Sequence, residues 1–507
     1  MDVEYIIVQA GGKGTRLKHL TANKPKGIVP VNNLPMIFHL MNKFKSKKFI
    51  IIADYKYDVM EKYLEVFSPV DYMVVRAEGT GTCAGIEQAT KYIPNNAPFM
   101  LIWSDLIVGE DFSLENLNDS TIGLSTNFEC RWSYKNNMFE EVPSVEYGVA
   151  GCFIFKNKQE ITGVPASGEF VKWLQSCNKT FNILKLNGTK EVGTTLAYEK
   201  NMSENVCRPF NSIEVCGDRI IKKGITDQGI KIGKYEVNWY REMSKLGYLR
   251  MPKIYSYEPL IMQKIDGSNI FKRDLNIEQK KIVVKNFVDA LIDLHSKSKS
   301  EINYFDLKEN YYTKTIDRLN KVRDLIPFAN KEYININGKN YKNIFFYKEE
   351  FKKIIEDILY DTNFTLIHGD CTFSNTLITD KLDIVFIDPR GYFGKTLLYG
   401  DEYYDWAKMY YSLVGNYDQF NNKKFILDIY DDRVSLNISS NGYEELENYF
   451  FSLIPNCNEK KIKLLHAIIW LSLTTYAWED YDSICGAFYN GLIYLNDFLE
   501  EEKNEIF

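Results

Sequence analysis

Two apolar segments of this chain run directly into glycine-containing turns, and they lie more than 350 residues apart. The first reads Ile6-Ile7-Val8-Gln9-Ala10-Gly11-Gly12-Lys13-Gly14-Thr15-Arg16-Leu17. The second is Phe364–Ile367, followed by His368-Gly369-Asp370. A strand that ends in such a turn brings the turn to the carboxyl edge of its sheet, where α/β proteins bind ligands. We therefore expect two separate sites, one in each half of the chain.

The length of the chain supports the same division. A chain of 507 residues is too long for one ordinary core, so two or three domains are expected. The polar segment 201–208 marks the boundary, which gives domains 1–204 and 205–507. A net charge of -6 without a long basic run argues against nucleic acid as a partner.

The chain start has no basic region before its apolar stretch, and no apolar run approaches the roughly 20 residues that span a bilayer. We expect a cytoplasmic protein without membrane insertion, acting on small molecules and nucleotides. Homo-oligomerisation is left open.

Strands and helices alternate in the first 110 residues, which predicts an α/β domain with a mostly parallel sheet. Helix–strand periodicity in the second half instead predicts an antiparallel hairpin followed by helices. The predicted strands are 5–10, 49–53, 72–76, 99–103, 212–215, 219–223, 260–264, 364–367 and 384–387. The predicted helices are 35–45, 58–67, 82–92, 234–246, 280–295 and 349–359, with long apolar helices after Lys460.

The N-terminal glycine turn suits phosphate binding, because glycines let backbone N–H groups close around an anion. Its spacing is neither that of a P-loop nor G-x-G-x-x-G. With Thr15-Arg16-Leu17 and Lys24-Pro25-Lys26 behind it, the string resembles the nucleotidyltransferase family that joins sugar 1-phosphates, and some other phosphorylated compounds, to nucleoside triphosphates. The resemblance implies a Rossmann-like fold. It also implies a nucleotide lined by Gly11, Gly12, Gly14 and Thr15, with Arg16 and Lys26 on the phosphates. Lys24 either shares that role or is a solvated surface lysine.

Three further segments fall where this family has site residues. Glu78-Gly79-Thr80 resembles the segment that contacts the base and ribose, and Asp105 follows an apolar strand where the family holds its catalytic Mg²⁺. Mg²⁺ suits the reaction because it prefers oxygen ligands and bridges phosphates. The second metal ligand would be Glu191, where the family usually has an Asp, and Glu169 lies where the family contacts substrate.

The C-terminal string carries the elements of a kinase loop. Asp370 is followed five residues later by Asn375, and Asp388 ends the next strand. In kinases one Asp accepts the hydroxyl proton, while an Asn and a second Asp hold Mg²⁺. The pattern resembles the aminoglycoside phosphotransferase and choline kinase family. The resemblance implies an α+β, bilobal, protein-kinase-like domain in which Asp370 is the base and Asn375 and Asp388 bind metal. His368, Asp401 and Asp405 would brace the loop.

The same resemblance implies the rest of a nucleotide site. Lys222 or Lys223 would be the ATP lysine, with Glu236 as its helix partner, and only one of the two lysines can face inward. Leu260–Lys264 would be the hinge strand. The acceptor pocket would lie among C-terminal helices that carry Trp478, Glu479 and Tyr481. These aromatic and acidic residues either cage a quaternary ammonium, stack on a sugar, or form helix core.

Together the two halves predict a bifunctional enzyme. The kinase would use ATP and Mg²⁺ to phosphorylate a small-molecule hydroxyl, with a sugar favoured. The transferase would then couple the product to NMP from CTP, UTP or GTP and release pyrophosphate, as in surface polysaccharide precursor synthesis. The alternatives are a choline or amino-alcohol kinase with a cytidylyltransferase, a regulatory pseudoenzyme, and two enzymes with unrelated substrates.

Overall fold

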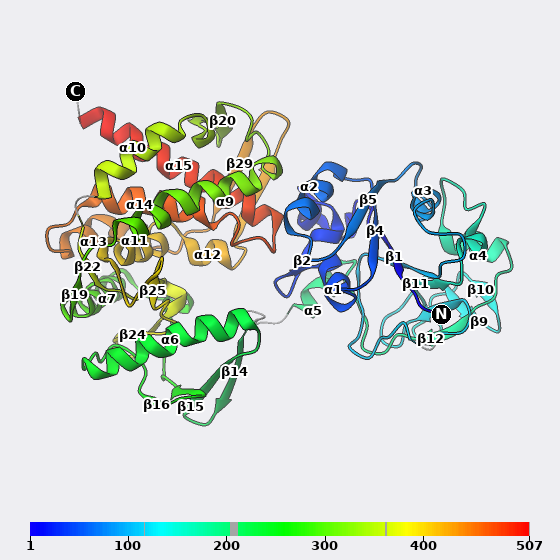
Figure 1. Cartoon of the computed structure of the whole chain (residues 1–507), viewed down its shortest axis with the longest axis horizontal. Coiled ribbons are helices and arrows are strands. Elements are labelled where there is room, and N and C mark those ends of the chain that lie inside the picture. The colour runs from blue at the N-terminus through cyan, green and yellow to red at the C-terminus, as the bar shows by residue number, and fades with distance from the viewer. Residues whose placement is uncertain (116, 203–210, 360–361, 506–507) are drawn as a thin grey trace. The chain divides into compact units, whose positions relative to one another are not determined.

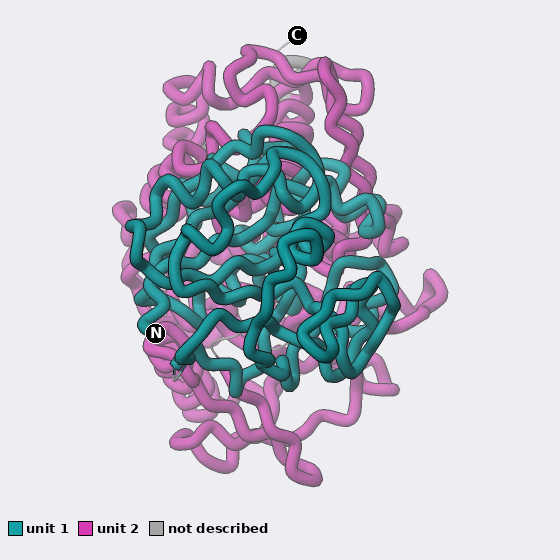
Figure 2. Tube along the Cα trace, turned by 90° about the vertical axis from the view of Figure 1, so that its right-hand side faces the viewer, with its two compact units in different colours: residues 1–206, 478–482 teal, residues 207–477, 483–507 magenta. Residues whose placement is uncertain are grey.

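The computed structural model describes residues 1–115, 117–202, 211–359 and 362–505 (Figure 1). The chain divides into two compact units (Figure 2), one of residues 1–206 with 478–482 and one of residues 207–477 with 483–507. The predicted boundary between 204 and 205 lies outside the described residues. Within the described ranges, no helix is both long and apolar enough to cross a membrane.

A seven-stranded sheet forms the centre of the first unit, in the order β12-β8-β11-β6-β1-β4-β5. Strand β1 pairs in parallel with β4 and β6, β4 pairs in parallel with β5, and β12 pairs in parallel with β8. Only β11 runs antiparallel to both of its neighbours in this sheet. The predicted mostly parallel α/β sheet is therefore confirmed. The strands are β1 (Tyr5–Gln9), β4 (Lys48–Ala53), β5 (Tyr72–Arg76), β6 (Phe99–Trp103), β8 (Thr121–Leu124), β11 (Val149–Phe155) and β12 (Asn182–Lys185).

The central strands are apolar on both faces because helices cover the sheet. Ile6, Ile7 and Val8 of β1 are all fully buried, as parallel strands between helical layers require. Helices α1 (Met36–Lys43) and α2 (Tyr57–Phe67) place Leu40, Met41 and Leu64 in the interior, while charged residues of α2 remain exposed.

The predicted helix 82–92 is wrong in its extent. Helix α3 covers only Ile86–Thr90, and residues before it form a turn. Gly85 has a φ of 79°, outside the helical region, and a Cβ at this position would clash with Ile52 and Ala77. The turn thus lies close against β4.

A four-stranded antiparallel sheet, β14-β15-β17-β16, begins the second unit. Helix α6 (Asp227–Lys245) packs on β15 and begins at Asp227 rather than at the predicted Lys234. The Thr226 side chain accepts a hydrogen bond from the Gly229 N–H, which caps this earlier start. The strands are β14 (Asn211–Cys216), β15 (Arg219–Gly224), β16 (Ile254–Tyr257) and β17 (Leu260–Gln263).

The remainder of the second unit is mainly helical, with short strands that carry the predicted kinase motifs. Helices α11 and α14 pack against each other in its core, where Trp470 is fully buried. The main elements are α7 (Ile277–Ser296), α9 (Lys314–Val322), α10 (Lys348–Leu359), β22 (Phe364–Leu366), β24 (Ile384–Phe386), α11 (Glu402–Leu413), α14 (Glu459–Leu473) and α15 (Tyr481–Glu505).

A fully buried ion pair joins α14 to the start of α11. The Lys461 ammonium lies 3.1 Å from an Asp401 oxygen, and neither side chain is exposed to solvent. Asp401 also caps α11 by accepting a hydrogen bond from the Tyr403 N–H. Removing one partner leaves the other charge buried, which is costly.

Lys461→Met should lower the free energy of unfolding of the second unit by about 3–5 kcal/mol, because the Asp401 carboxylate loses its buried counter-charge. Lys463→Met is the matched control on the same helix, since Lys463 pairs with Glu501 at the surface and should change stability by no more than about 1 kcal/mol. Urea unfolding followed by tryptophan fluorescence measures both. Equal losses of unfolding free energy in the two variants would contradict a stabilising role of the buried Lys461–Asp401 pair.

Candidate active sites

Four predicted site residues of the first unit come together from four segments. The Lys26 ammonium lies 2.7 Å from Asp105 Oδ2, and Arg16 Nη2 lies 3.9 Å from Glu191 Oε1. Strand β13 (Lys190–Glu191) pairs with β7 (Leu106–Ile107), which brings Glu191 beside the turn that follows β6. Arg16 lies in the 3₁₀ turn 15–21, and Lys26 begins the 3₁₀ turn 26–28.

Gly193 lies at the centre of this cluster. A Cβ at this position would meet Glu191 Oε1, Asp105 Oδ2 and Arg16 Nη2 at less than ordinary van der Waals distance. The two carboxylates therefore converge on one small volume, next to a backbone that only glycine leaves accessible. Sequence spacing alone left the role of Glu191 in doubt, and its pairing with β7 places it beside Asp105.

The electrostatics of the two carboxylates differ. Burial acts to raise the pKa of Asp105, but the Lys26 ammonium and the Arg16 guanidinium outweigh it and hold that pKa below its ordinary value. Burial and the nearby Asp105 charge raise the pKa of Glu191 instead. The Asp105 carboxylate is thus stabilised as an anion, whereas the ionised form of Glu191 is destabilised by its surroundings.

These residues fit a divalent cation. Asp105 Oδ1 is buried and has no hydrogen-bond partner, although Oδ2 is paired with Lys26. A buried, unpartnered carboxylate oxygen beside a second carboxylate is a donor set of the hard oxygen type that Mg²⁺ prefers. Asp105 and Glu191 would hold such an ion.

The two predicted nucleotide loops have defined backbone geometry. Gly14 has a φ of 65°, and a Cβ there would crowd the Lys26 side chain. In the second loop, Thr80 O accepts a hydrogen bond from the Gly168 N–H at 2.9 Å, and Gly79 passes so close to Ala166 O that no side chain would fit. Glu169, a predicted substrate contact, is paired with Arg131 at 2.9 Å.

The N-terminal part of the chain is similar to a known protein family. Residues 5–121 match the family model described as nucleotidyl transferase. The N-terminal unit contains a nucleotidyltransferase-like domain.

Two curated relatives share this part of the chain. A D-glycero-alpha-D-manno-heptose 1-phosphate guanylyltransferase from Campylobacter jejuni is 31% identical over 125 residues, which are 24% of this chain and 55% of that protein. A mannose-1-phosphate guanyltransferase from Aspergillus oryzae is 31% identical over 114 residues, 21% of this chain and 31% of the relative. The chain thus spans about half the length of the first relative and about a third of the second. Among solved structures, HddC from Yersinia pseudotuberculosis aligns at 23% identity and a TM-score of 0.33, covering 39% of this chain and 98% of that chain.

Lys24 is not a solvated surface lysine, which was one of its two expected roles. Its side chain is 3% exposed and lies 3.1 Å from Asp480 and 2.5 Å from Asp482, within the unit that includes residues 478–482. Burial acts to lower the pKa of Lys24, but these two carboxylates raise it overall. Lys24 is therefore a buried ion-pair residue, and its second expected role, on the phosphates, has no support from these contacts.

The residues predicted for the site of the second unit are also in contact with one another. Asn375 Nδ2 donates to Asp370 O and to Asp370 Oδ2, both at 2.9 Å. The Lys222 ammonium lies 2.6 Å from Asp388 Oδ1 and 2.8 Å from Glu236 Oε2. The Lys222 contacts thus link the turn after β24 to strand β15 and helix α6, and the Ile387 N–H donates to Asn375 O, in the loop after β22, at 3.0 Å.

Lys222 is the inward-facing lysine of the pair. Its side chain is 11% exposed, whereas Lys223 is exposed on the other side of the strand. Burial acts to lower the pKa of Lys222, but Asp388 and Glu236 raise it above its ordinary value, so the ammonium is charged at neutral pH. A cavity of about 620 Å³ opens beside it, lined by Lys222, Glu236, Tyr257 and Leu260, among others.

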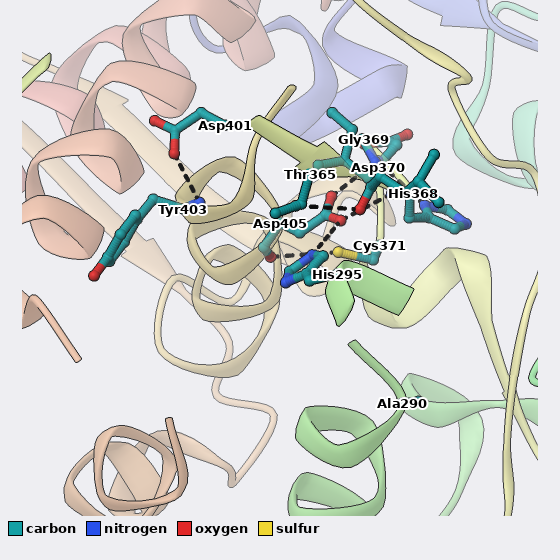
Figure 3. A network of polar contacts seen from close by, with 12 residues as sticks. Ala290, His295, Thr365, His368, Gly369, Asp370, Cys371, Asp401, Tyr403 and Asp405 are labelled. Atoms are coloured by element: carbon teal, nitrogen blue, oxygen red, sulfur yellow. Dashed lines mark hydrogen bonds and ion pairs between the residues drawn. The ribbon is translucent and has the colours of Figure 1, made fainter. Parts of the chain in front are cut away.

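A buried carboxylate holds the loop that carries Asp370 (Figure 3). Asp405 accepts hydrogen bonds from the His368 N–H at 2.8 Å and the Gly369 N–H at 2.7 Å, and its Oδ2 lies 3.1 Å from His295 Nε2. His368 Nδ1 accepts from the Asp370 N–H, and its Nε2 donates to Ile387 O. Both ring nitrogens are engaged and burial lowers the pKa of His368, so this residue braces the loop as a neutral group.

Asn375 and Asp388 offer an amide oxygen and a carboxylate, which are hard ligands of the kind that Mg²⁺ takes. The oxygen atoms of these two side chains are therefore suitable ligands for Mg²⁺.

Two cations beside Asp370 escaped the sequence analysis. The Lys408 ammonium lies 3.0 Å from Asp370 Oδ1, and Arg390 Nη1 donates to the Tyr404 hydroxyl at 3.0 Å. Lys408 lies one helical turn after Asp405 on α11, so a helical projection from Asp405 would have found it. Arg390 lies two residues after the predicted metal ligand Asp388 in the sequence.

The residues at 478–481 that were predicted to bind the acceptor include side chains packed in the protein interior. Trp478 belongs to the first unit, where its ring lies 5.9 Å from Phe38 and 6.2 Å from Phe67. Tyr481 is 1% exposed. These contacts are those of core side chains, and a role of Trp478, Glu479 and Tyr481 in binding an acceptor stays a prediction.

Glu191→Gln should raise the melting temperature of the ligand-free protein at pH 7.5. The pKa of Glu191 is raised on folding, so the ionised side chain opposes folding above its unfolded pKa, and removal of the charge relieves this. The gain should shrink as the pH falls toward 4, where the wild-type carboxyl is mainly protonated in both states. The lost pairing with Arg16 costs little, because that guanidinium is 67% exposed.

Thermal unfolding between pH 4 and 8 measures this effect. Glu199→Gln is the matched control, since Glu199 is exposed, and it should leave the melting temperature nearly unchanged. A lower melting temperature for Glu191→Gln at pH 7.5 would contradict the assignment.

Proposed function

We propose that the first unit transfers a nucleotidyl group from a nucleoside triphosphate to a phosphorylated sugar and releases pyrophosphate. A substrate phosphate oxygen would attack the α-phosphorus in line, and the pyrophosphate would leave on the opposite side. No protein nucleophile is required. The single observation that carries this proposal is the convergence of Arg16, Lys26, Asp105 and Glu191 beneath the glycine turn.

The residues of this cluster have distinct parts in the reaction. Arg16 is largely exposed at the rim, where its guanidinium can reach a phosphate, and Lys26 would neutralise charge that develops near Asp105. A divalent ion held by Asp105 and Glu191 would supply further neutralisation of the phosphates. Holding both reactants in line accounts for much of the expected rate enhancement.

The named relatives guide the choice of substrates. Both are guanylyltransferases that act on hexose- or heptose-type 1-phosphates by their names. We take GTP and a sugar 1-phosphate as the first pair to test, with CTP and UTP as the other nucleotides.

The second unit is proposed to be a small-molecule kinase that uses ATP and Mg²⁺. The Lys222–Glu236 pair, the cavity beside it and the Asp370–Asn375 bonds support this proposal. Asp370 would accept the acceptor hydroxyl proton, Asn375 would orient Asp370, and Lys222 would contact ATP phosphates.

A shared chain suggests that the kinase product, or a compound derived from it, feeds the transferase, as in the synthesis of surface polysaccharide precursors. The amino-alcohol alternative loses support because Trp478 packs with Phe38. The pseudoenzyme alternative would require one or both sites to be inactive although their named residues are in contact.

Asp370→Ala should lower ATP-dependent phosphorylation at least 100-fold while leaving nucleotidyl transfer to a supplied sugar 1-phosphate intact. Asp105→Ala should do the reverse. ADP release and pyrophosphate release, measured separately with GTP, CTP and UTP, test both variants.

Asp380→Ala is the control, because Asp380 is exposed and pairs with Arg273 at the surface. Loss of both activities in either folded variant would contradict two separate sites. If no combination of a sugar 1-phosphate with GTP, CTP or UTP released pyrophosphate, the transferase proposal would be contradicted.

A further inference from the structure

Four basic side chains gather beside the proposed catalytic base of the second unit. They come from three segments: helix α9, the turn after β24 and helix α11. Tyr404 lies among them, since Arg390 donates to its hydroxyl at 3.0 Å and the Lys408 ammonium lies 5.8 Å from its ring centre. The four residues, called here the basic cluster, are Lys314, Arg318, Arg390 and Lys408.

The positive charge of the basic cluster is poorly balanced. Lys408 pairs with Asp370, but in the described part of the chain no carboxylate lies within 4.0 Å of the charged groups of Lys314, Arg318 or Arg390. Arg318 donates instead to neutral Ser472, to its carbonyl oxygen at 2.6 Å and its hydroxyl at 3.0 Å. The cluster therefore brings together more basic groups than carboxylates, with Asp370 paired to Lys408 and Glu309 acting on Lys314.

The effect of this imbalance is seen at Lys314. Burial and the neighbouring charges of Arg390, Arg318 and Lys408 lower the pKa of Lys314 to about 6, and Glu309 offsets this only in part. Partly buried cations that repel one another cost free energy unless an anion joins them. Such a cost is typical of a site whose charge partner is a ligand.

We infer that the basic cluster binds an anionic group, a phosphate or a carboxylate, on the alcohol that the second unit phosphorylates. This inference rests on the kinase activity proposed above. Lys408 contacts Asp370 directly, so an anion held by the cluster would bring its own hydroxyl close to the base. Guanidinium groups such as those of Arg318 and Arg390 bind phosphate and carboxylate through paired N–H donors.

The charge of the basic cluster also excludes one class of acceptor. A quaternary ammonium such as choline would be repelled by the charged side chains of Arg318, Arg390 and Lys408. The aromatic rings at the cluster do not reverse this, because the Arg390 guanidinium already lies 4.6 Å from the Tyr392 ring centre and the Lys408 ammonium 5.3 Å from that of Tyr411. The acceptor of the proposed kinase is thus a hydroxyl compound that is already negatively charged.

ADP formation by the full chain with ATP and Mg²⁺ tests the inference. The acceptors are mannose, mannose 6-phosphate, glucuronate and choline, so that neutral, phosphorylated, carboxylated and cationic alcohols are compared. Mannose 6-phosphate or glucuronate should be used at least 10-fold better than mannose, and the better of the two identifies the anion. Lys314→Met and Arg318→Met should each raise KM for that acceptor about 10-fold or more, with a smaller effect on KM for ATP.

Lys353→Met is the matched control, because Lys353 is exposed on α10, and it should leave the acceptor KM unchanged. A preference for choline or mannose would overturn the inference and leave the kinase proposal standing. A rise in KM for ATP alone would also overturn it, since the cluster would then serve the nucleotide.

Calorimetric titration of inorganic phosphate without ATP separates the two proposals. Binding that is lost in Lys314→Met, together with no ADP formation from any acceptor, would support an anion site and contradict the kinase. Absence of phosphate binding in the wild-type chain, with acceptor KM values insensitive to Lys314→Met, would overturn the inference.

Discussion

The parallel register of β1 between β4 and β6 is the constraint on which the first site depends. Gln9 lies opposite both Ile52 and Trp103, so the three strands end at the same level and their following turns leave one edge of the sheet. The glycine turn and Asp105 therefore lie together although they are far apart in the sequence. Gln9 also donates from its side chain to Thr82 O and Ala84 O, which fixes the second loop to the same edge. A shift of one residue in this register would separate the groups that must meet.

In the second unit, the loop that carries Asp370 is positioned by hydrogen bonds to a buried carboxylate rather than by strand register. The Asp370 loop follows β22, whose neighbours in its three-stranded sheet, β19 (Lys299–Ser300) and β27 (Tyr399–Asp401), are antiparallel, so a shared strand edge does not position the loop. The buried Asp405 carboxylate does so instead, because it accepts hydrogen bonds from two successive backbone N–H groups of the loop. Burying this charge is tolerable only with such donors. The orientation of Asp370 is thus tied to helix α11, which also carries Lys408.

Most elements that place the two sites could be predicted from local sequence, because apolar strands and amphipathic helices have distinct periods. The strand predicted at 5–10 is observed at Tyr5–Gln9, and that predicted at 99–103 is observed unchanged. Local pattern failed where tertiary contact decides the conformation. Gly85 ends the turn before α3 because it packs on Ile52, and Lys24 is buried by carboxylates more than 450 residues away in sequence. Pairing of Glu191 with β7 and convergence of Lys314 with Arg390 are long-range in the same sense, and no spacing rule reports them.

The two sites handle negative charge in opposite ways. In the first, the cations Arg16 and Lys26 face two carboxylates, so the protein itself offers little net charge to a triphosphate. In the proposed transfer reaction, a divalent ion held by Asp105 and Glu191 would make these carboxylates part of a positive site for phosphates. In the basic cluster, four basic side chains gather beside the Asp370 carboxylate, so an anion can be held directly by side chains. The difference suits the two proposed tasks. A nucleoside triphosphate would reach the first site with its own Mg²⁺, whereas the inferred anionic alcohol would have to be held by the protein and aligned with the base.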